Sequence, residues 1–308
     1  MDVHRSAHRA LSLFVVTALT AIAAAASAKG AGPIPSGYQA VPIRYGSLNK
    51  MLISVSINGH PATLLVDTAA NQILIDAARA QSLGITPSHH GLRYIGTVAI
   101  NGQPSPIAFA RSVSAGPVDF GSRQVVLLNS NSTSDTVDGT LGADLLVARK
   151  AVIDCYGKRI YFKPADSSGS SSFVAPSGFT RVAMRREENG GFTVPASLRG
   201  QSLRLLVDTG GPVTTFNDAT LNSLGVPMQA TAASSRFTPG TKRPMSLAEV
   251  PDFTIGNFKV RSTRVAASAL PAYALHQGQT QIAGLIGIEL LVACHAIIDL
   301  GSMNLYLK

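Results

Sequence analysis

Charged residues are scarce in this 308-residue chain, since they make up 14% of it against 45% hydrophobic residues. That balance excludes an intrinsically disordered chain and is typical of a globular protein with a large core. Cysteine is scarcer still, because Cys155 and Cys294 are the only two. They permit one disulfide at most, and two buried free thiols are the alternative. Neither they nor the His89-His90 pair, which is expected in a solvated loop, has metal-ligand spacing.

Several functional motifs are also missing. The net charge is +9, but the basic residues are scattered and no aromatic residues interleave with them, which argues against nucleic-acid binding. No Gly-x-Ser-x-Gly elbow is present, and no histidine has the setting of a catalytic triad. Beyond residue 28, no apolar run is long enough for stable membrane insertion. No cofactor is expected.

The one long apolar run lies at the N-terminus. Residues 1–10 carry His and Arg, residues 11–26 are almost wholly apolar, and Ala26-Ser27-Ala28 is a small-residue cleavage pattern. Together they predict a signal peptide over residues 1–28, with an uncleaved membrane anchor as the alternative. We therefore expect an exported protein, either periplasmic or secreted. Residues 29–45 are either a short pro-segment or a first strand.

The most informative feature is an internal repeat. Residues 64–85 and 205–226 align without a gap, and nine of the 22 positions are identical. Each copy contains three apolar residues followed by Asp-Thr, at Asp67 and at Asp208. A duplicated strand that ends in a carboxylate is the simplest way to bring two carboxylates face to face.

The repeat extends to both sides of the acid motif. Before it, an alternating apolar and polar run predicts a strand that reaches a turn at Asn58-Gly59 or Arg199-Gly200. After it, each copy predicts a short strand and a short helix. Asp76 and Asn217 are expected to cap these helices, and a glycine is expected to end each of them, at Gly84 and Gly225.

A second block, residues 139–163, matches residues 284–308 at 11 of 25 positions. Each block predicts an apolar strand that leads into a glycine, then a short helix and a hairpin. The Ser-rich stretch 164–178 has the composition of a linker. We therefore expect an N-terminal lobe over 29–163 and a C-terminal lobe over 179–308, in a mostly β fold with short helices.

Two buried carboxyl groups within hydrogen-bond distance cannot both ionise, so Asp67 and Asp208 are expected to share one proton. Such a pair can hold a water molecule, draw a proton from it and donate a proton to a carbonyl oxygen, which hydrolyses an amide without a metal or a covalent intermediate. The hydroxyls of Thr68 and Thr209 can bind the backbone across the symmetry axis. The small residues that follow, including Ala69 and Gly210, leave room for a substrate backbone.

These motifs resemble those of the retropepsin and pepsin group of aspartic proteases, and the resemblance covers both halves of the chain. It implies a bilobed acid-protease fold with two pseudo-twofold-related, β-barrel-like lobes and a polypeptide substrate held between them. It also implies catalysis by Asp67 and Asp208, and Gly142 and Gly287 packed beneath these acids. Because the chain already contains both halves, a monomer is expected.

The resemblance further implies a β-hairpin flap over the cleft. The candidate flaps are Tyr94–Asn101 and Phe237–Lys242, and the weakest candidate substrate contacts are Tyr94, Gly211 and Phe237. The two C-terminal hairpins would form one sheet that joins the lobes. Cys155 and Cys294 lie beside these strands, so an inter-lobe disulfide and two free thiols are about equally expected.

One departure from the family pattern concerns the first motif, which is Asp-Thr-Ala where Asp-Thr-Gly is usual. Ala69 adds a methyl group to the floor of the cleft and forbids conformations that only glycine adopts. The first hypothesis is therefore an exported aspartic endopeptidase that cleaves extended polypeptides. The alternatives are a weakened or inactive retropepsin-like module that binds peptides, and a structural envelope protein whose acids only stabilise loops.

Overall fold

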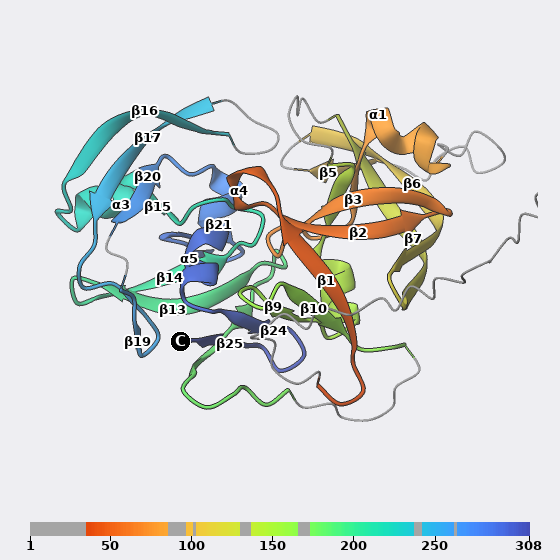
Figure 1. Ribbon diagram of the computed structural model, residues 1–308. Coiled ribbons are helices and arrows are strands. Elements are labelled where there is room, and N and C mark those ends of the chain that lie inside the picture. The colour runs from red at the N-terminus through yellow and green to blue at the C-terminus, as the bar shows by residue number, and fades with distance from the viewer. Residues whose placement is uncertain are drawn as a thin grey trace, which may run out of the picture. The chain divides into compact units, whose positions relative to one another are not determined.

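The computed structural model describes residues 35–85, 97–100, 103–129, 137–165, 173–236, 242–261 and 264–308. The fold is mostly β, as predicted (Figure 1). Within these described residues, the first copy of the repeat contains ten strands, two short α-helices and two 3-10 turns. These are β1 (Gln39–Tyr45), η1 (Ser47–Asn49), β2 (Met51–Ile57), β3 (His60–Val66), β4 (Leu74–Asp76), α1 (Ala77–Ala80), η2 (Gln81–Leu83), β5 (Thr97–Ile100), β6 (Gln103–Ala115), β7 (Val118–Leu128), β8 (Gly139–Leu141), α2 (Ala143–Ala148), β9 (Val152–Asp154) and β10 (Arg159–Phe162).

The second copy repeats this order with several additions. Its elements are β11 (Thr180–Ala183), β12 (Arg185–Arg186), β13 (Phe192–Leu198), β14 (Gln201–Val207), β15 (Thr215–Asn217), α3 (Asp218–Ser223), β16 (Met228–Arg236), β17 (Lys242–Glu249), β18 (Thr254–Ile255), β19 (Phe258–Lys259), β20 (Arg264–Ser268), α4 (Ala272–Leu275), β21 (His276–Gln277), β22 (Thr280–Gln281), β23 (Gly284–Ile286), α5 (Ile288–Ala293), β24 (Ile297–Asp299) and β25 (Asn304–Leu307). Helix α4 and the β21–β22 hairpin lie where the register between the copies shifts by four residues.

The strand that carries each acid motif is paired in the same way in both copies. Strand β3 runs parallel to β8, and β8 runs antiparallel to β4. Strand β14 runs parallel to β23, and β23 runs antiparallel to β15. Each acid therefore follows a strand that is paired within its own copy, and the duplicated sequence gives the same strand pairing in both copies.

The two predicted hairpin turns are present. Asn58 and Arg199 have left-handed φ angles of 52°, and the glycines that follow them have φ angles of 83° and 77°. The side chains of Asn58 and Arg199 then perform the same task in each copy: they donate hydrogen bonds to the last carbonyls of the following helical segment, at Leu83–Gly84 and Leu224–Gly225. The two glycines that were expected to end these segments are left-handed, as predicted.

The expected helix caps differ from each other. The Asp76 carboxylate accepts a hydrogen bond from the Ala78 amide, as a cap does. The prediction for Asn217 is wrong, because its side chain makes no capping hydrogen bond. Its Oδ1 atom instead accepts from the amide of Leu270, 53 residues away, since the side chain is buried beside that loop.

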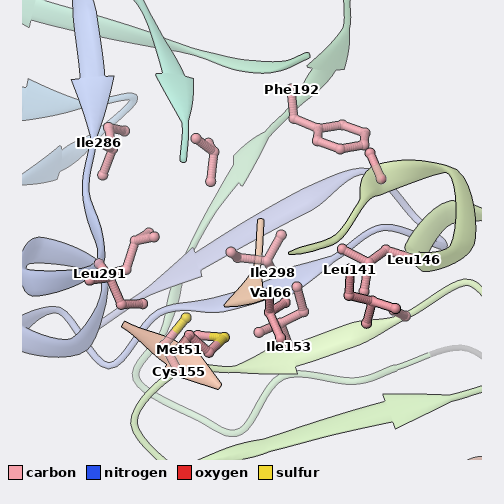
Figure 2. Close-up of a cluster of buried hydrophobic side chains, with 14 of the residues drawn as sticks. Met51, Val66, Leu141, Leu146, Ile153, Cys155, Phe192, Ile286, Leu291 and Ile298 are labelled. Atoms are coloured by element: carbon pink, nitrogen blue, oxygen red, sulfur yellow. The ribbon is translucent and has the colours of Figure 1, made fainter. Parts of the chain in front are cut away.

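The C-terminal hairpins of the two copies form one sheet, as the resemblance implied. Strand β9 pairs antiparallel with β24, and Ile153 stands opposite Ile298 in the register. Figure 2 shows these two side chains among buried residues contributed by both copies, including Val66 and Ile286. A single apolar core therefore runs through the join between the copies.

Cys155 and Cys294 are both buried, and both are free thiols rather than a disulfide. The possible pro-segment is partly a strand, because β1 covers residues 39–45 and pairs with β2 and β10. No helix in the described part of the chain is long and apolar enough to cross a membrane. The predicted signal peptide and His89-His90 lie outside the described residues.

Candidate active site

The two acid residues begin where their strands end. Asp67 follows β3 directly, and its amide donates to the Leu141 carbonyl at 3.1 Å. Asp208 follows β14, and its amide donates to the Ile286 carbonyl at 3.0 Å. Since Leu141 and Ile286 are the last residues of equivalent strands, the same neighbour fixes the backbone of each acid.

Thr68 and Thr209 tie the two acid loops together. The hydroxyl of Thr68 donates to the Val207 carbonyl at 2.6 Å, and that of Thr209 donates to the Val66 carbonyl at 2.8 Å. Each hydroxyl also accepts a hydrogen bond from the amide of the other threonine, at 3.1 Å in both directions. Both threonines are fully buried, so these four hydrogen bonds are shielded from water and hold the loops in one arrangement.

The two carboxyl groups lie together and are oriented by matching backbone donors. Oδ1 of Asp67 accepts from the amides of Ala69 and Ala70, at 2.8 and 3.2 Å. Oδ1 of Asp208 accepts from the amides of Gly210 and Gly211, both at 2.9 Å. The carboxyl groups are within hydrogen-bonding reach of each other, so each has a second oxygen available for a shared proton.

Burial changes the proton affinity of both acids. Burial raises the pKa of Asp208 most, and the negative charge of Asp67 raises it further. The pKa of Asp67 is also raised by burial, although hydrogen bonds from its two backbone donors oppose the shift. A raised pKa in both members, with each in the field of the other, is the electrostatic signature of a pair that keeps one proton between two carboxyl groups.

The residues that follow each threonine adopt ordinary backbone dihedrals. Ala69 is not among the residues with a left-handed φ, and neither is Gly210 or Gly211. The loop therefore does not need a conformation restricted to glycine at position 69. A side chain at Gly210 would be excluded for another reason, because its Cβ would lie 2.4 Å from Cγ of Asp67.

Gly142 and Gly287 lie beneath the chain that follows each acid rather than beneath the acids themselves. A Cβ on Gly142 would lie 2.3 Å from the carbonyl oxygen of Gln72, and one on Gly287 would lie 2.4 Å from the Val213 carbonyl carbon. Glycine permits this approach of two backbones. The glycines thus support the acid loops at the stretch that returns them to the sheet.

Two acidic residues that sequence reasoning missed complete this support. Asp144 and Glu289 occupy the first turns of α2 and α5. Glu289 accepts a hydrogen bond from the Thr214 amide at 2.6 Å, and Asp144 accepts one from the equivalent amide, that of Ile73. The signal was present in the sequence, because these acids are aligned in the second repeat block.

The remaining candidate residues are placed as follows. Gly211 donates its amide to Asp208 and lies at the acid pair. Tyr94 and Phe237 lie outside the described residues. Strands β5 and β6 pair antiparallel next to the first candidate flap segment, and β16 and β17 pair antiparallel next to the second, so both flap assignments stay predictions. Among the described residues, no group of three or more His, Cys, Asp or Glu side chains is arranged to hold a metal ion.

Comparison with known proteins identifies a family and a similar fold. A family model described as aspartyl protease matches residues 53–145 and 194–290, which are the two copies of the repeat. The crystal structure of an aspartic proteinase from Irpex lacteus has a similar fold, with a TM-score of 0.53 and 15% sequence identity, over 88% of this chain and 97% of that chain. No curated protein sequence matches the chain. Since the family model covers more than half of the sequence, in both copies, the chain belongs to the aspartyl protease family.

Proposed function

We propose that the chain is an aspartic endopeptidase that hydrolyses peptide bonds of extended polypeptides with water activated between Asp67 and Asp208. The observation that carries the proposal is the pairing of these two carboxyl groups, each oriented by two backbone amides of its own loop. Family membership and fold support proteolysis in general, and a polypeptide substrate follows from proteolysis.

The reaction proceeds in two proton-balanced steps. The ionised carboxylate takes a proton from water as the water oxygen attacks the peptide carbonyl carbon, and the protonated carboxyl donates its proton to the carbonyl oxygen. This gives a neutral tetrahedral diol. When the C–N bond breaks, the first carboxyl passes its proton to the departing nitrogen and the second carboxylate takes one back from a diol hydroxyl. The pair returns to its starting state with one proton.

Preorganisation of the pair is the contribution of the fold. The reciprocal threonine hydrogen bonds hold the two loops together and the backbone donors orient each carboxyl group, so the pair needs little rearrangement when charge moves between its members. Because burial raises the pKa of both acids, the state with one shared proton extends above the usual carboxyl range. We expect cleavage under acidic to mildly acidic conditions.

A denatured protein and a peptide library, incubated with the purified mature chain across pH, test the proposal. We expect internal cleavage that a statine-type inhibitor blocks, since its hydroxyl mimics the tetrahedral diol between the two carboxyl groups. The matched control is Asp119→Asn, which removes one exposed carboxylate in the β6–β7 turn region and should leave cleavage intact. No cleavage at any pH, together with no binding of the inhibitor, contradicts the proposal.

A second candidate function is a non-catalytic module that binds extended peptides in the same cleft. The observation that favours it is the Ala69-Ala70 pair, which carries two methyl groups where the second loop has Gly210-Gly211. For this function, peptides bind with measurable affinity yet stay intact after long incubation. Turnover that disappears when either acid is replaced by Asn eliminates it.

We also propose that the protein is exported and acts as a monomer in the periplasm or outside the cell. The signal-peptide pattern of residues 1–28 supports export. The presence of both acid motifs in one chain supports the monomer, because no second copy is needed to complete the pair. N-terminal sequencing of the exported protein and its sedimentation as a single chain test these proposals.

A further inference from the structure

The first acid loop contacts the C-terminal lobe through Asn71, four residues after Asp67. Nδ2 of Asn71 donates a hydrogen bond to the carbonyl of Asn189 at 2.7 Å. A Cβ on Gly190 would lie 2.4 Å from Oδ1 of Asn71, so these two residues lie in direct contact. The aligned residue in the second loop is Pro212, whose side chain has no donor, so that loop cannot make the same side-chain hydrogen bond.

The residues that Asn71 contacts belong to a tight turn, 187–191, between β12 and β13. The amide of Glu187 donates to the Gly191 carbonyl at 2.8 Å, and the amide of Gly190 donates to the Glu187 carbonyl at 2.9 Å. Gly190 has a φ angle of 88°, a left-handed value that glycine adopts without strain. The turn thus has a fixed shape, in which it presents a carbonyl and a glycine to the first acid loop.

The carboxylate of Glu187 anchors this turn. Arg185 donates to it through Nε at 2.8 Å and through Nη2 at 2.7 Å. The hydroxyl of Thr280 donates to it at 2.8 Å, and the hydroxyl of Thr193 donates to it as well. The Glu187 side chain is only 5% exposed, and hydrogen bonds to a charged group are stronger than those between neutral groups. The base of the turn therefore cannot move without breaking several strong hydrogen bonds.

Strand β21 and helix α4 add to this support. Nδ2 of Asn189 donates to the carbonyl of His276, in β21, at 3.1 Å. Helix α4 belongs through Ala274 to the apolar cluster of the C-terminal lobe against which Ala69 packs. The first acid loop therefore rests on the C-terminal lobe at Ala69 as well as at Asn71.

We propose that Asn71 and Glu187 are positioning residues for Asp67. Glu187 fixes the turn, and the turn holds Asn71. Asn71 directly follows the two alanines whose amides donate to the Asp67 carboxylate. The threonine hydrogen bonds hold the loop before these amides and Asn71 holds it after them, so both amides stay directed at Oδ1. The inference rests on the proposed function, because Asp67 is one of the two acids of that reaction.

The first test measures amide hydrogen exchange by NMR in wild type, Asn71→Ala, Glu187→Gln and the double variant. The Asn71 side chain is exposed and Gln keeps the shape of Glu, so we expect all of them to fold. The amides that donate to Asp67 should exchange about threefold to tenfold faster in each variant, the effect of one lost hydrogen bond. The amides that donate to Asp208 should change by less than about twofold. Because both substitutions break one chain of contacts, the double variant should exchange at the rate of Asn71→Ala within about a factor of two.

Cleavage kinetics separate a positioning role from a simple loss of stability. Misdirected amides weaken the acid pair without changing substrate contacts, so Asn71→Ala should lower kcat about threefold to tenfold and change KM by less than about twofold. The control is Asn304→Ala. Nδ2 of Asn304 also donates to a carbonyl, that of Ser302 at 2.9 Å, but within the β24–β25 hairpin. This control should leave kcat and the exchange of both acid loops unchanged.

Unchanged exchange at the Asp67 amides in either single variant, or an equal increase in both acid loops, overturns the inference. A wild-type kcat in Asn71→Ala also overturns it. The two proposals fail separately. If wild type cleaves no peptide but Asn71→Ala opens the first loop alone, the protease proposal fails and the positioning of Asp67 stands. If wild type cleaves peptides and neither loop changes its exchange, the protease proposal stands and this inference fails.

Discussion

The hydroxyl of Thr209 joins the two acid loops, and its removal should weaken the whole molecule. In Thr209→Val, the Val66 carbonyl loses its donor and the Thr68 amide loses its acceptor. Both groups lie in a fully buried region, where an unpartnered polar group costs about 1–3 kcal/mol. The two together predict a loss of roughly 2–6 kcal/mol in the free energy of unfolding.

Urea unfolding followed by far-ultraviolet circular dichroism measures this loss. The matched control is Thr209→Ser, which keeps the hydroxyl and removes only a methyl group, at a cost of about 1 kcal/mol. If the threonine hydrogen bonds hold the loops together, Val should destabilise the protein clearly more than Ser. Equal losses in the two variants would refute the reasoning, because the hydroxyl would then contribute nothing beyond its neighbouring methyl group.

Three further predictions follow from the packing and the charges. Gly142→Ala should cost about 3 kcal/mol and reduce cleavage, because its Cβ would lie 2.3 Å from the Gln72 carbonyl oxygen. Gly59→Ala meets no neighbour and should cost only about 1 kcal/mol for its left-handed φ. Thermal unfolding of the two variants distinguishes these costs. Asp208→Asn should gain stability relative to wild type as pH rises from 4 to 8, because a carboxyl whose folded pKa is raised loses stability as pH rises above its unfolded pKa; urea midpoints across pH measure this. Hydrogen bonds from Arg185 and two threonines outweigh burial and lower the pKa of Glu187 to about 2. Glu187→Gln should therefore lower the free energy of unfolding by about 1–2 kcal/mol at pH 7. The difference in stability from wild type should vanish as pH falls from about 4 to about 2, where the carboxylate becomes protonated.

The acid motifs and their surroundings were predictable because the sequence states them twice. The aligned repeats locate Asp67 and Asp208 at the ends of equivalent strands, and the position of an acid at the end of a strand is fixed by the pairing of that strand. The Asn58-Gly59 turn was predictable from local dihedral preference, and the Arg199-Gly200 turn from its alignment with that turn in the repeat. In these cases the physical cause lies within a few residues of its effect.

Other features depend on contacts between distant residues and left no local signal. Asn217 has the residue type and position of a helix cap, but its side chain accepts a hydrogen bond from the amide of Leu270, in a loop 53 residues away. Helix α4 lies in the stretch where the copies differ in length, so no second copy indicated it. Ala69 was read as a departure from the family pattern, whereas its contact with the C-terminal cluster appears only once the lobes are packed.

Cleavage of a denatured protein by wild type, Asp67→Asn and Asp208→Asn, measured side by side from pH 3 to pH 8, tests the central claim most directly. An amide at either position cannot exchange a proton with its partner, so each variant should lose at least about a thousandfold in turnover while keeping its fold. Wild-type cleavage that both variants retain would contradict the account, because the two carboxyl groups would then not be the acid and base of the reaction.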